Sequence, residues 1–246
     1  MNAIEKRYAK EFAACQSILR LADDLFERNE TKVVVDRSRY ATMAVASLYS
    51  KARKQASAVF LVASQGYGED ALILARSLTN LCIDLGYITA EAAQVEARAR
   101  RWAAKGRVER RKFGKRVGET PPDENKIKWP AEEALADEWP STIDKRAQDA
   151  GLQNFYNFSY RHGSSFDHSD SWSATSFLEP AQDGAVLDML TGPHGRYVDL
   201  ALLTLACAFA EIACRFGRFY GFDFLRVDQE MERHVRTAFP PTETAR

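Results

Sequence analysis

The stretch 69–88, "EDALILARSLTNLCIDLGYI", decides the fold because it is apolar on almost every side when wound into a helix. Its apolar residues form two adjoining faces: Ala71, Leu74, Leu78, Leu81 and Leu85 on the first, and Leu72, Ile73, Ile83 and Tyr87 on the second. A helix that is apolar nearly all round is buried at the centre of a protein. Since the helical pattern runs on to Lys105, the sequence predicts one central helix over 69–105.

Three polar residues, Arg76, Asn80 and Asp84, interrupt these faces at intervals of four. That spacing places them on one line along the helix. An arginine on a buried helix must be paired, because an unpaired buried charge is very costly. The line is interpreted either as a structural network that fixes the register of the helix or as the polar wall of a ligand pocket.

The rest of the chain predicts an all-α fold. Helical spacing of apolar residues predicts further helices over 3–28, 36–65, 141–149, 152–168, 196–220 and 223–238. Prolines and mixed charge predict a long irregular connection near 113–140, and turn-rich sequence predicts a loop or small hairpin near 171–195. We therefore expect a single helical domain over 1–246, a bundle of six or seven helices, with a disordered tail at 239–246.

Composition narrows the class of protein. Hydrophobic residues make up 46% and charged residues 28% of the chain, and the net charge is zero, so overall charge indicates no partner. The four cysteines lie in apolar helical patterns without a C-x-x-C pair, which suits a reducing compartment and predicts no zinc site. Asp199 and Glu211 interrupt the most apolar stretch, 198–214, which predicts a buried helix rather than a membrane span. We expect a cytoplasmic protein without a signal peptide, membrane association, metal or cofactor.

Charge is unevenly distributed in the middle of the chain. Residues 98–118 hold ten Lys or Arg and one acid, whereas residues 119–149 hold nine acids and four bases. The basic segment could track an RNA backbone, with Trp102 and Phe113 stacking on bases; its candidate phosphate ligands are Arg100, Arg101, Arg107, Arg110 and Arg111. The alternative is a solvated helix end whose charge the acidic segment offsets. The two interpretations are compatible if the acidic segment shields the basic segment until RNA displaces it.

The segment 160–170, "YRHGSSFDHSD", is the best candidate for chemistry. A histidine can take and give a proton near neutral pH, and an arginine can grip a phosphate with two hydrogen bonds. Together they could cleave RNA without a metal: the histidine would deprotonate the ribose 2′-hydroxyl and the arginine would bind the scissile phosphate. The alternative is a polar helix end in which His162 and His168 cap carbonyl groups. The two remaining histidines, His194 and His234, are expected on the surface.

Arg161, His162 and His168, with six residues between the arginine and the last histidine, resemble the motif of the HEPN superfamily. This resemblance implies a small all-α protein that acts as a homodimer with paired motifs at the interface. Many members are ribonucleases of toxin–antitoxin, phage-defence and RNA-processing systems. The resemblance therefore implies RNA as substrate and an antitoxin or defence-system protein as a possible partner.

Two longer stretches, "GYGEDALILARSLTNLCIDLGYI" at 66–88 and "FYNFSYRHGSSFDHSD" at 155–170, resemble the mainly bacterial helical family called domain of unknown function 5677. The resemblance covers about residues 50–225. The matching positions are Gly66, Tyr67, Asp70, Ala71, Arg76, Ser77, Leu78, Tyr160, Ser164 and His168. The family usually has a glutamate where this chain has Asn80, so Asp84 or Asp167 would have to pair with Arg76.

Both resemblances include His168, but they differ in the arginine. The leading hypothesis is a HEPN-like, metal-independent ribonuclease, or an inactive relative, of a bacterial defence or toxin system. In it His168 is the acid and base, Arg161 or Arg76 binds the phosphate, and Tyr160 and His162 assist; Ser164 and Asn80 belong to the substrate pocket. The alternatives are a non-enzymatic helical binding or scaffold module and a small-ligand pocket organised by Arg76.

Overall fold

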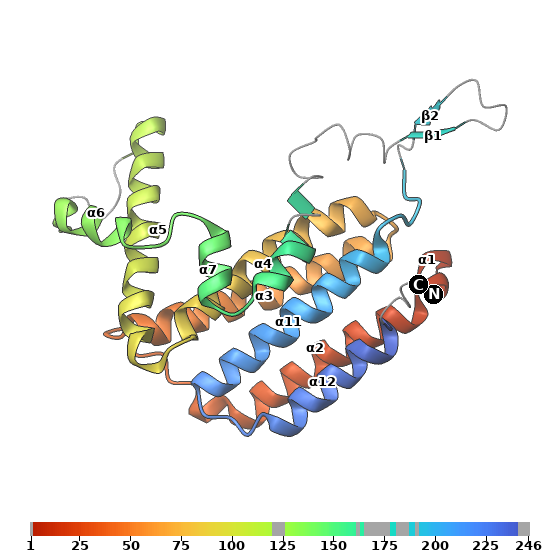
Figure 1. The fold of residues 1–246 in the computed structure, drawn as a ribbon, viewed down its shortest axis with the longest axis horizontal. Helices are drawn as coiled ribbons and strands as arrows, with labels where there is room; N and C mark the ends of the chain where they lie inside the picture. Colours follow the sequence, from red (N-terminus) through yellow and green to blue (C-terminus); the bar gives the residue numbers. More distant parts are fainter. Residues whose placement is uncertain are drawn as a thin grey trace. The chain divides into compact units, whose positions relative to one another are not determined.

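In the residues that it describes, the computed structural model is helical apart from one short pair of strands (Figure 1). It describes residues 2–119, 126–160, 163–164, 178–180, 187–189 and 192–240. The chain divides into two compact units. Unit 1 comprises Met1–Val33, Tyr49–Cys82 and Asn154–Arg246, and unit 2 comprises Val34–Leu48 and Ile83–Gln153. The single domain expected from the sequence stays a prediction.

Unit 1 contains most of the long helices. Its elements are α1 (Ala3–Arg7), α2 (Ala9–Asn29), a 3₁₀ turn (Glu30–Lys32), most of α3 (Tyr40–Ser64) and α4 (Gly68–Thr89), α8 (Gln153–Phe155), a π-helical turn (Tyr156–Tyr160), β1 (Leu178–Pro180), β2 (Leu187–Met189), α11 (Val198–Phe219) and α12 (Leu225–Ala238). Helices α2, α11 and α12 lie side by side (Figure 1).

Unit 2 contains the first residues of α3, the last residues of α4 and three further helices. These are α5 (Val95–Val117), α6 (Trp129–Asp137) and α7 (Ile143–Asp149), with a 3₁₀ turn (Ala92–Gln94) before α5. Helix α6 packs against α5 through Trp129 and Ala136, which share a small apolar cluster with Ala104 and Val108 (Figure 1).

The core of unit 1 confirms the predicted burial of the apolar helices. In α4, Leu72 and Leu78 are completely buried, and Phe209 and Ile212 of α11 are also completely buried. The ring of Tyr49 on α3 stacks on Phe216 of α11 with centroids 4.0 Å apart. Burying such side chains contributes about 1.5–3 kcal/mol each, so the apolar faces that define the helices in sequence also hold the unit together.

Helices α4 and α11 are long and apolar enough to cross a membrane by length and composition. In each, 67% of the most apolar 18-residue window is buried inside the protein. The core helix of a globular bundle meets the same criteria, so this is weak evidence for a membrane span.

The predicted helix over 69–105 is wrong in its length, because it is two helices. Helix α4 ends at Thr89, whose hydroxyl donates to the Leu85 carbonyl at 2.8 Å. Arg98 of α5 then donates to the Tyr87 carbonyl at 2.8 Å, and its guanidinium lies 4.5 Å from the Tyr87 ring. The last carbonyls of a helix need such partners. Arg98 thus satisfies the end of α4, and it is a structural residue rather than part of a solvated basic face.

The predicted irregular connection over 113–140 contains the end of one helix and the whole of another among its described residues. Helix α5 continues to Val117 and ends at Gly118, which adopts a left-handed conformation with φ +77°. Helix α6 occupies 129–137, and its proline, Pro130, lies in the first turn. Proline is tolerated there because the first N–H groups of a helix have no intrahelical acceptor. The proline that argued against a helix in the sequence therefore stands at the start of one.

Short helices raise the number of elements above the expected six or seven. Among the described residues, α1, α6, α7 and α8 add to the six helices of 14 residues or more. Within the region 171–195, β1 pairs antiparallel with β2, and Glu179 faces Asp188 in register. In the expected tail 239–246, the Phe239 N–H still donates to the Val235 carbonyl at 2.9 Å, so the helical hydrogen bonding reaches that residue. Residues 241–246 lie outside the described residues.

Candidate functional site

Arg76 and Tyr160 meet in unit 1, although 84 positions separate them in the sequence. Arg76 Nη2 donates a hydrogen bond to the Tyr160 hydroxyl at 2.9 Å. The guanidinium also lies 4.6 Å from the centre of the Tyr160 ring, within the range of a cation–π interaction. Tyr156 stacks on Tyr160 with centroids 5.0 Å apart. Arg76 and Tyr160 are both half-buried. The two stacked tyrosines therefore hold an arginine that solvent or a ligand can still reach.

Gly163 brings the motif segment against Arg76. A Cβ added to Gly163 would lie 2.6 Å from the Arg76 Cβ and 3.2 Å from the Leu72 carbonyl oxygen. No side chain fits there without displacing its neighbours. Gly163 therefore packs on α4 at the position of Arg76. Ser164, the next residue, is half-buried.

Two buried polar atoms lie on the elements that carry this pair. Asn80 Oδ1 on α4 and Ser159 Oγ, beside Tyr160, are buried and have no hydrogen-bond partner among the described residues. Buried polar groups are normally satisfied, so an unpaired acceptor marks either a cost in stability or a place for a bound water or ligand. Asn80 stands one helical turn after Arg76, where it could contact a ligand that the arginine binds.

The polar line on α4 separates into two parts. Arg76 contacts Tyr160 in unit 1, whereas Asp84 accepts a hydrogen bond from Arg146 Nε of α7 in unit 2 at 2.8 Å. Both members of that second pair are mostly buried, with side-chain exposures of 19% for Asp84 and 13% for Arg146. Asp84 thus forms a structural ion pair with Arg146. Of the remaining predicted site residues, Arg161, His162 and His168 lie outside the described residues, as does Asp167.

The basic segment of α5 is partly neutralised by the acids around α6. Arg101 pairs with Glu138 at 2.7 Å, Arg111 pairs with Glu133 at 3.1 Å, and Arg107 pairs with Glu132. Arg111 also lies 4.1 Å from the centre of the Trp129 ring. These three candidate phosphate ligands are therefore engaged within unit 2. Arg100 and Arg110 are exposed and make no ion pair with a described residue.

Glu69 and His194 form a buried pair that the sequence did not predict. The Glu69 side chain is 5% exposed and that of His194 is 16% exposed, and Glu69 Oε1 lies 3.4 Å from His194 Nε2 without hydrogen-bond geometry. Burial raises the pKa of Glu69 above 4.5, and the nearby His194 acts in the opposite direction. His194 is therefore not a surface residue. No local pattern links the turn 66–69 to the loop 192–195, because the contact depends on packing between segments far apart in the chain.

The Glu69–His194 pair lies where the backbone of residues 66–69 approaches that of residues 194–196 closely. The Gly195 N–H donates to the Gly66 carbonyl at 3.0 Å, and a Cβ on Gly68 would lie 1.6 Å from the Arg196 carbonyl oxygen. His194 Nδ1 faces the Arg196 N–H at 3.3 Å and accepts from it. With Nδ1 as acceptor, the proton of a neutral His194 belongs on Nε2, which faces Glu69.

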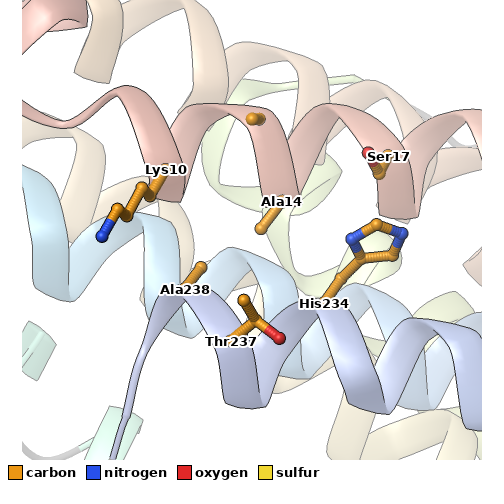
Figure 2. A pocket seen from close by; sticks show the side chains of 7 residues that line it. Lys10, Ala14, Ser17, His234, Thr237 and Ala238 are labelled. Carbon is orange, nitrogen blue, oxygen red and sulfur yellow. The ribbon is translucent and has the colours of Figure 1, made fainter.

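His234 lines a hollow of about 320 Å³ between α2 and α12, together with Lys10 and Ser17 (Figure 2). The remaining lining is small: Ala13, Ala14, Thr237 and Ala238. His234 is half-buried rather than fully exposed on the surface. Within the described part of the chain, no group of three or more His, Cys, Asp or Glu side chains could hold a metal ion.

Comparison with known proteins identifies a family but no characterised relative. The model described as Family of unknown function (DUF5677) matches residues 42–185, which is more than half of the chain and includes Arg76, Tyr160 and His168. No curated protein and no solved structure gives a significant match. The HEPN relationship stays a prediction. The chain belongs to the family of unknown function DUF5677.

Proposed function

We propose that this protein is a metal-independent ribonuclease in which Arg76 binds the scissile phosphate. The observation that supports this proposal is the contact between Arg76 and Tyr160, which immediately precedes the Arg161–His162 motif. Gly163 packs on Arg76 as well, so two residues that flank Arg161 and His162 are anchored at the same arginine.

Tyr160 preorganises the Arg76 side chain. A flexible arginine loses conformational entropy when it binds an anion, but here the ring and hydroxyl of Tyr160 already restrict the guanidinium. Preorganised donors stabilise charge that develops in a transition state without further rearrangement. In the proposed reaction that charge develops on the phosphate oxygens.

The chemistry assigned to the motif rests on the sequence. His168 takes the proton of the ribose 2′-hydroxyl, the 2′-oxygen forms a bond to phosphorus, and the bond from phosphorus to the 5′-oxygen breaks. His162, or a histidine of a second copy, returns a proton to that 5′-oxygen. The products are a 2′,3′-cyclic phosphate and a 5′-hydroxyl, so no metal or oxidant enters the balance.

The test is incubation of an RNA pool with the full chain in EDTA, with product ends identified chemically. We expect cleavage that leaves cyclic phosphates, and a loss of about 100-fold or more in Arg76→Ala and His168→Ala. The activity of Arg161→Ala shows whether Arg161 or Arg76 binds the scissile phosphate. Arg20→Ala, which removes an exposed arginine of the same unit, is the matched control and should cleave normally.

Two results would reject this function. Wild-type protein that cuts no RNA is not a ribonuclease, even if it binds one. Cleavage that survives in His168→Ala would remove the assigned acid and base. Circular dichroism of each variant separates a lost site from a lost fold.

A further inference from the structure

Unit 2 carries an open groove of about 470 Å³ beside α5. This volume lies within the usual range for small-ligand pockets, roughly 300–1,000 Å³. Trp102 and Gly106 of α5 line it, and Trp139, two residues after α6, lines it as well. Two indole rings and several charged side chains thus border one cavity, which lies outside the Arg76 site.

Trp139 is held in a fixed orientation. It is 6% exposed, and the Tyr87 ring meets it edge to face with centroids 5.0 Å apart. The Arg146 guanidinium lies 5.4 Å from the centre of its ring. Trp102, by contrast, is half-buried, so part of its ring surface remains accessible from the groove. Trp102 is therefore the indole that is suited to stacking with a planar ring system, and the buried Trp139 forms a fixed wall beside it.

The charges that line the groove favour an anion. Lys105, Arg107 and Arg110 supply three cations, against the two carboxylates of Asp84 and Glu109. Of these cations, Lys105 pairs with Glu109 and Arg107 pairs with Glu132. Both carboxylates already have partners: Asp84 accepts from Arg146, and Glu109 lies 3.3 Å from Lys105 and 3.1 Å from Lys112. These two lysines hold the pKa of Glu109 below its ordinary value. Arg110 is exposed and pairs with no described residue, so it can meet a phosphate without breaking an ion pair.

Gly106 leaves the groove open. It is exposed, and a Cβ added there would meet no atom within 4 Å. A side chain at this position of α5 would therefore project into space that the protein does not use. The same feature offers a way to fill the groove without disturbing the packing of unit 2.

We propose that this groove binds a planar base together with its attached phosphate, with the base stacked on Trp102 beside Trp139 and the phosphate on Arg110. The two sources of this chemistry are a free nucleotide and one nucleotide unit of single-stranded RNA. The groove itself is independent of the ribonuclease activity, and only the RNA source rests on the proposed function.

The central experiment compares Gly106→Leu with Ala97→Leu. Gly106→Leu fills the groove, whereas Ala97→Leu places the same side chain at an exposed position nearer the start of α5. Binding of AMP and UMP is measured by calorimetry, and binding of a labelled 12-nucleotide single-stranded RNA by fluorescence anisotropy. We expect at least tenfold weaker binding for Gly106→Leu and wild-type binding for Ala97→Leu.

Two further variants test the assigned contacts. Trp102→Ala should weaken binding by at least about fivefold, since stacking of one base contributes that much or more. Arg110→Ala should weaken binding and lower the dependence of log affinity on log salt by about 0.7 for single-stranded RNA.

The outcomes separate the two sources and the two proposals. Binding of nucleotides that Gly106→Leu abolishes identifies a free nucleotide, whereas binding of the oligonucleotide alone identifies RNA. Wild-type protein that binds neither nucleotide nor RNA overturns the groove assignment, as does equal binding by wild type and Gly106→Leu. If wild type and Gly106→Leu cut RNA with the same KM, the ribonuclease stands and RNA is not the ligand of the groove. If the groove binds nucleotides or RNA but the protein cuts no RNA, the groove assignment stands and the ribonuclease proposal fails.

Discussion

The guanidinium of Arg76 on α4 lies 4.6 Å from the centre of the Tyr160 ring and donates a hydrogen bond to its hydroxyl at 2.9 Å. One aromatic side chain thus engages an arginine both through its face and through its polar end. The pair connects the central helix to the segment that begins the histidine motif. Its strength can be measured separately from any activity.

Tyr160→Phe keeps the ring and removes the hydroxyl. We expect the free energy of unfolding to fall by about 1–2 kcal/mol, because a hydrogen bond to a charged, half-buried group is lost. Urea unfolding monitored by circular dichroism measures this change. Tyr67→Phe, at a side chain that is 42% exposed, is the control and should change stability by less than about 0.5 kcal/mol. Equal effects of the two substitutions would show that the Tyr160 hydroxyl contributes nothing.

Gly163→Ala should destabilise the protein by about 1–3 kcal/mol, because its Cβ would lie 2.6 Å from the Arg76 Cβ. The matched change is Gly106→Ala, where nothing lies within 4 Å and the helix gains a better helix former. That variant should be more stable by about 0.5–1 kcal/mol. Thermal unfolding of both variants checks the prediction, and a neutral Gly163→Ala would contradict the contact with Arg76.

Glu69→Gln should alter how stability depends on pH. Burial raises the pKa of Glu69 above 4.5, so the folded state holds this proton more tightly than the unfolded state. The associated stabilisation is fully present below pH 4.5 and is lost as pH rises through the folded pKa. The variant lacks this loss, so the difference in unfolding free energy between variant and wild type should grow in favour of the variant as pH rises.

Urea unfolding from pH 4 to pH 8 measures that difference. Asp70→Asn, at an exposed carboxylate in the same turn, controls for a charge removed from the start of α4. If Glu69→Gln and wild type keep a constant difference across this range, the burial of Glu69 does not affect its titration.

Neutralising the acids around α6 tests whether they compete with RNA. In a triple variant, Glu132→Gln, Glu133→Gln and Glu138→Gln release the three arginines of α5 that they pair with. We expect tighter binding of single-stranded RNA and a dependence of log affinity on log salt that is steeper by up to about 2. The pairs of Glu133 and Glu138, whose carboxylates are about half exposed, should contribute about 0–1 kcal/mol each. Glu132 is only 16% exposed, so most of the loss of stability should come from Glu132→Gln.

The control for the α6 variant is Glu230→Gln with Glu232→Gln on α12, where the acids pair with Arg233 and Arg236 of their own helix. Removal of charge there should leave the salt dependence unchanged. A similar gain in both variants would mean that net charge, and not release of the α5 arginines, determines RNA binding.

The parts of the fold that the sequence predicted correctly are those that depend on local periodicity. The apolar faces of α4 and α11 are visible in the sequence because a buried helix must be apolar on each packed side. The helix boundaries were harder to predict from the sequence. Arg98 ends α4 by a contact from the next helix, and Pro130 starts a helix in a region where prolines suggested a connection.

For the candidate site, the sequence identified Arg76 and Tyr160 as members of one constellation, since both match the family pattern. It could not identify them as direct partners, and it favoured an acid for Arg76 because a buried charge usually requires one. Among the described residues, the hydroxyl and ring of Tyr160 contact Arg76, and the expected pairing with Asp167 lies outside the described residues. Asp84, the acid that the spacing suggests, accepts a hydrogen bond from Arg146.

The sequence by itself therefore determined the helical class, the burial of the central helix and the family to which the chain belongs. Only the tertiary structure decided that Arg76 meets Tyr160, that Glu69 meets His194, and that the acids around α6 pair with the arginines of α5. The reason is physical. Periodicity along one helix reports which face is buried, whereas a contact between distant segments depends on how the helices pack, and no local pattern encodes that packing.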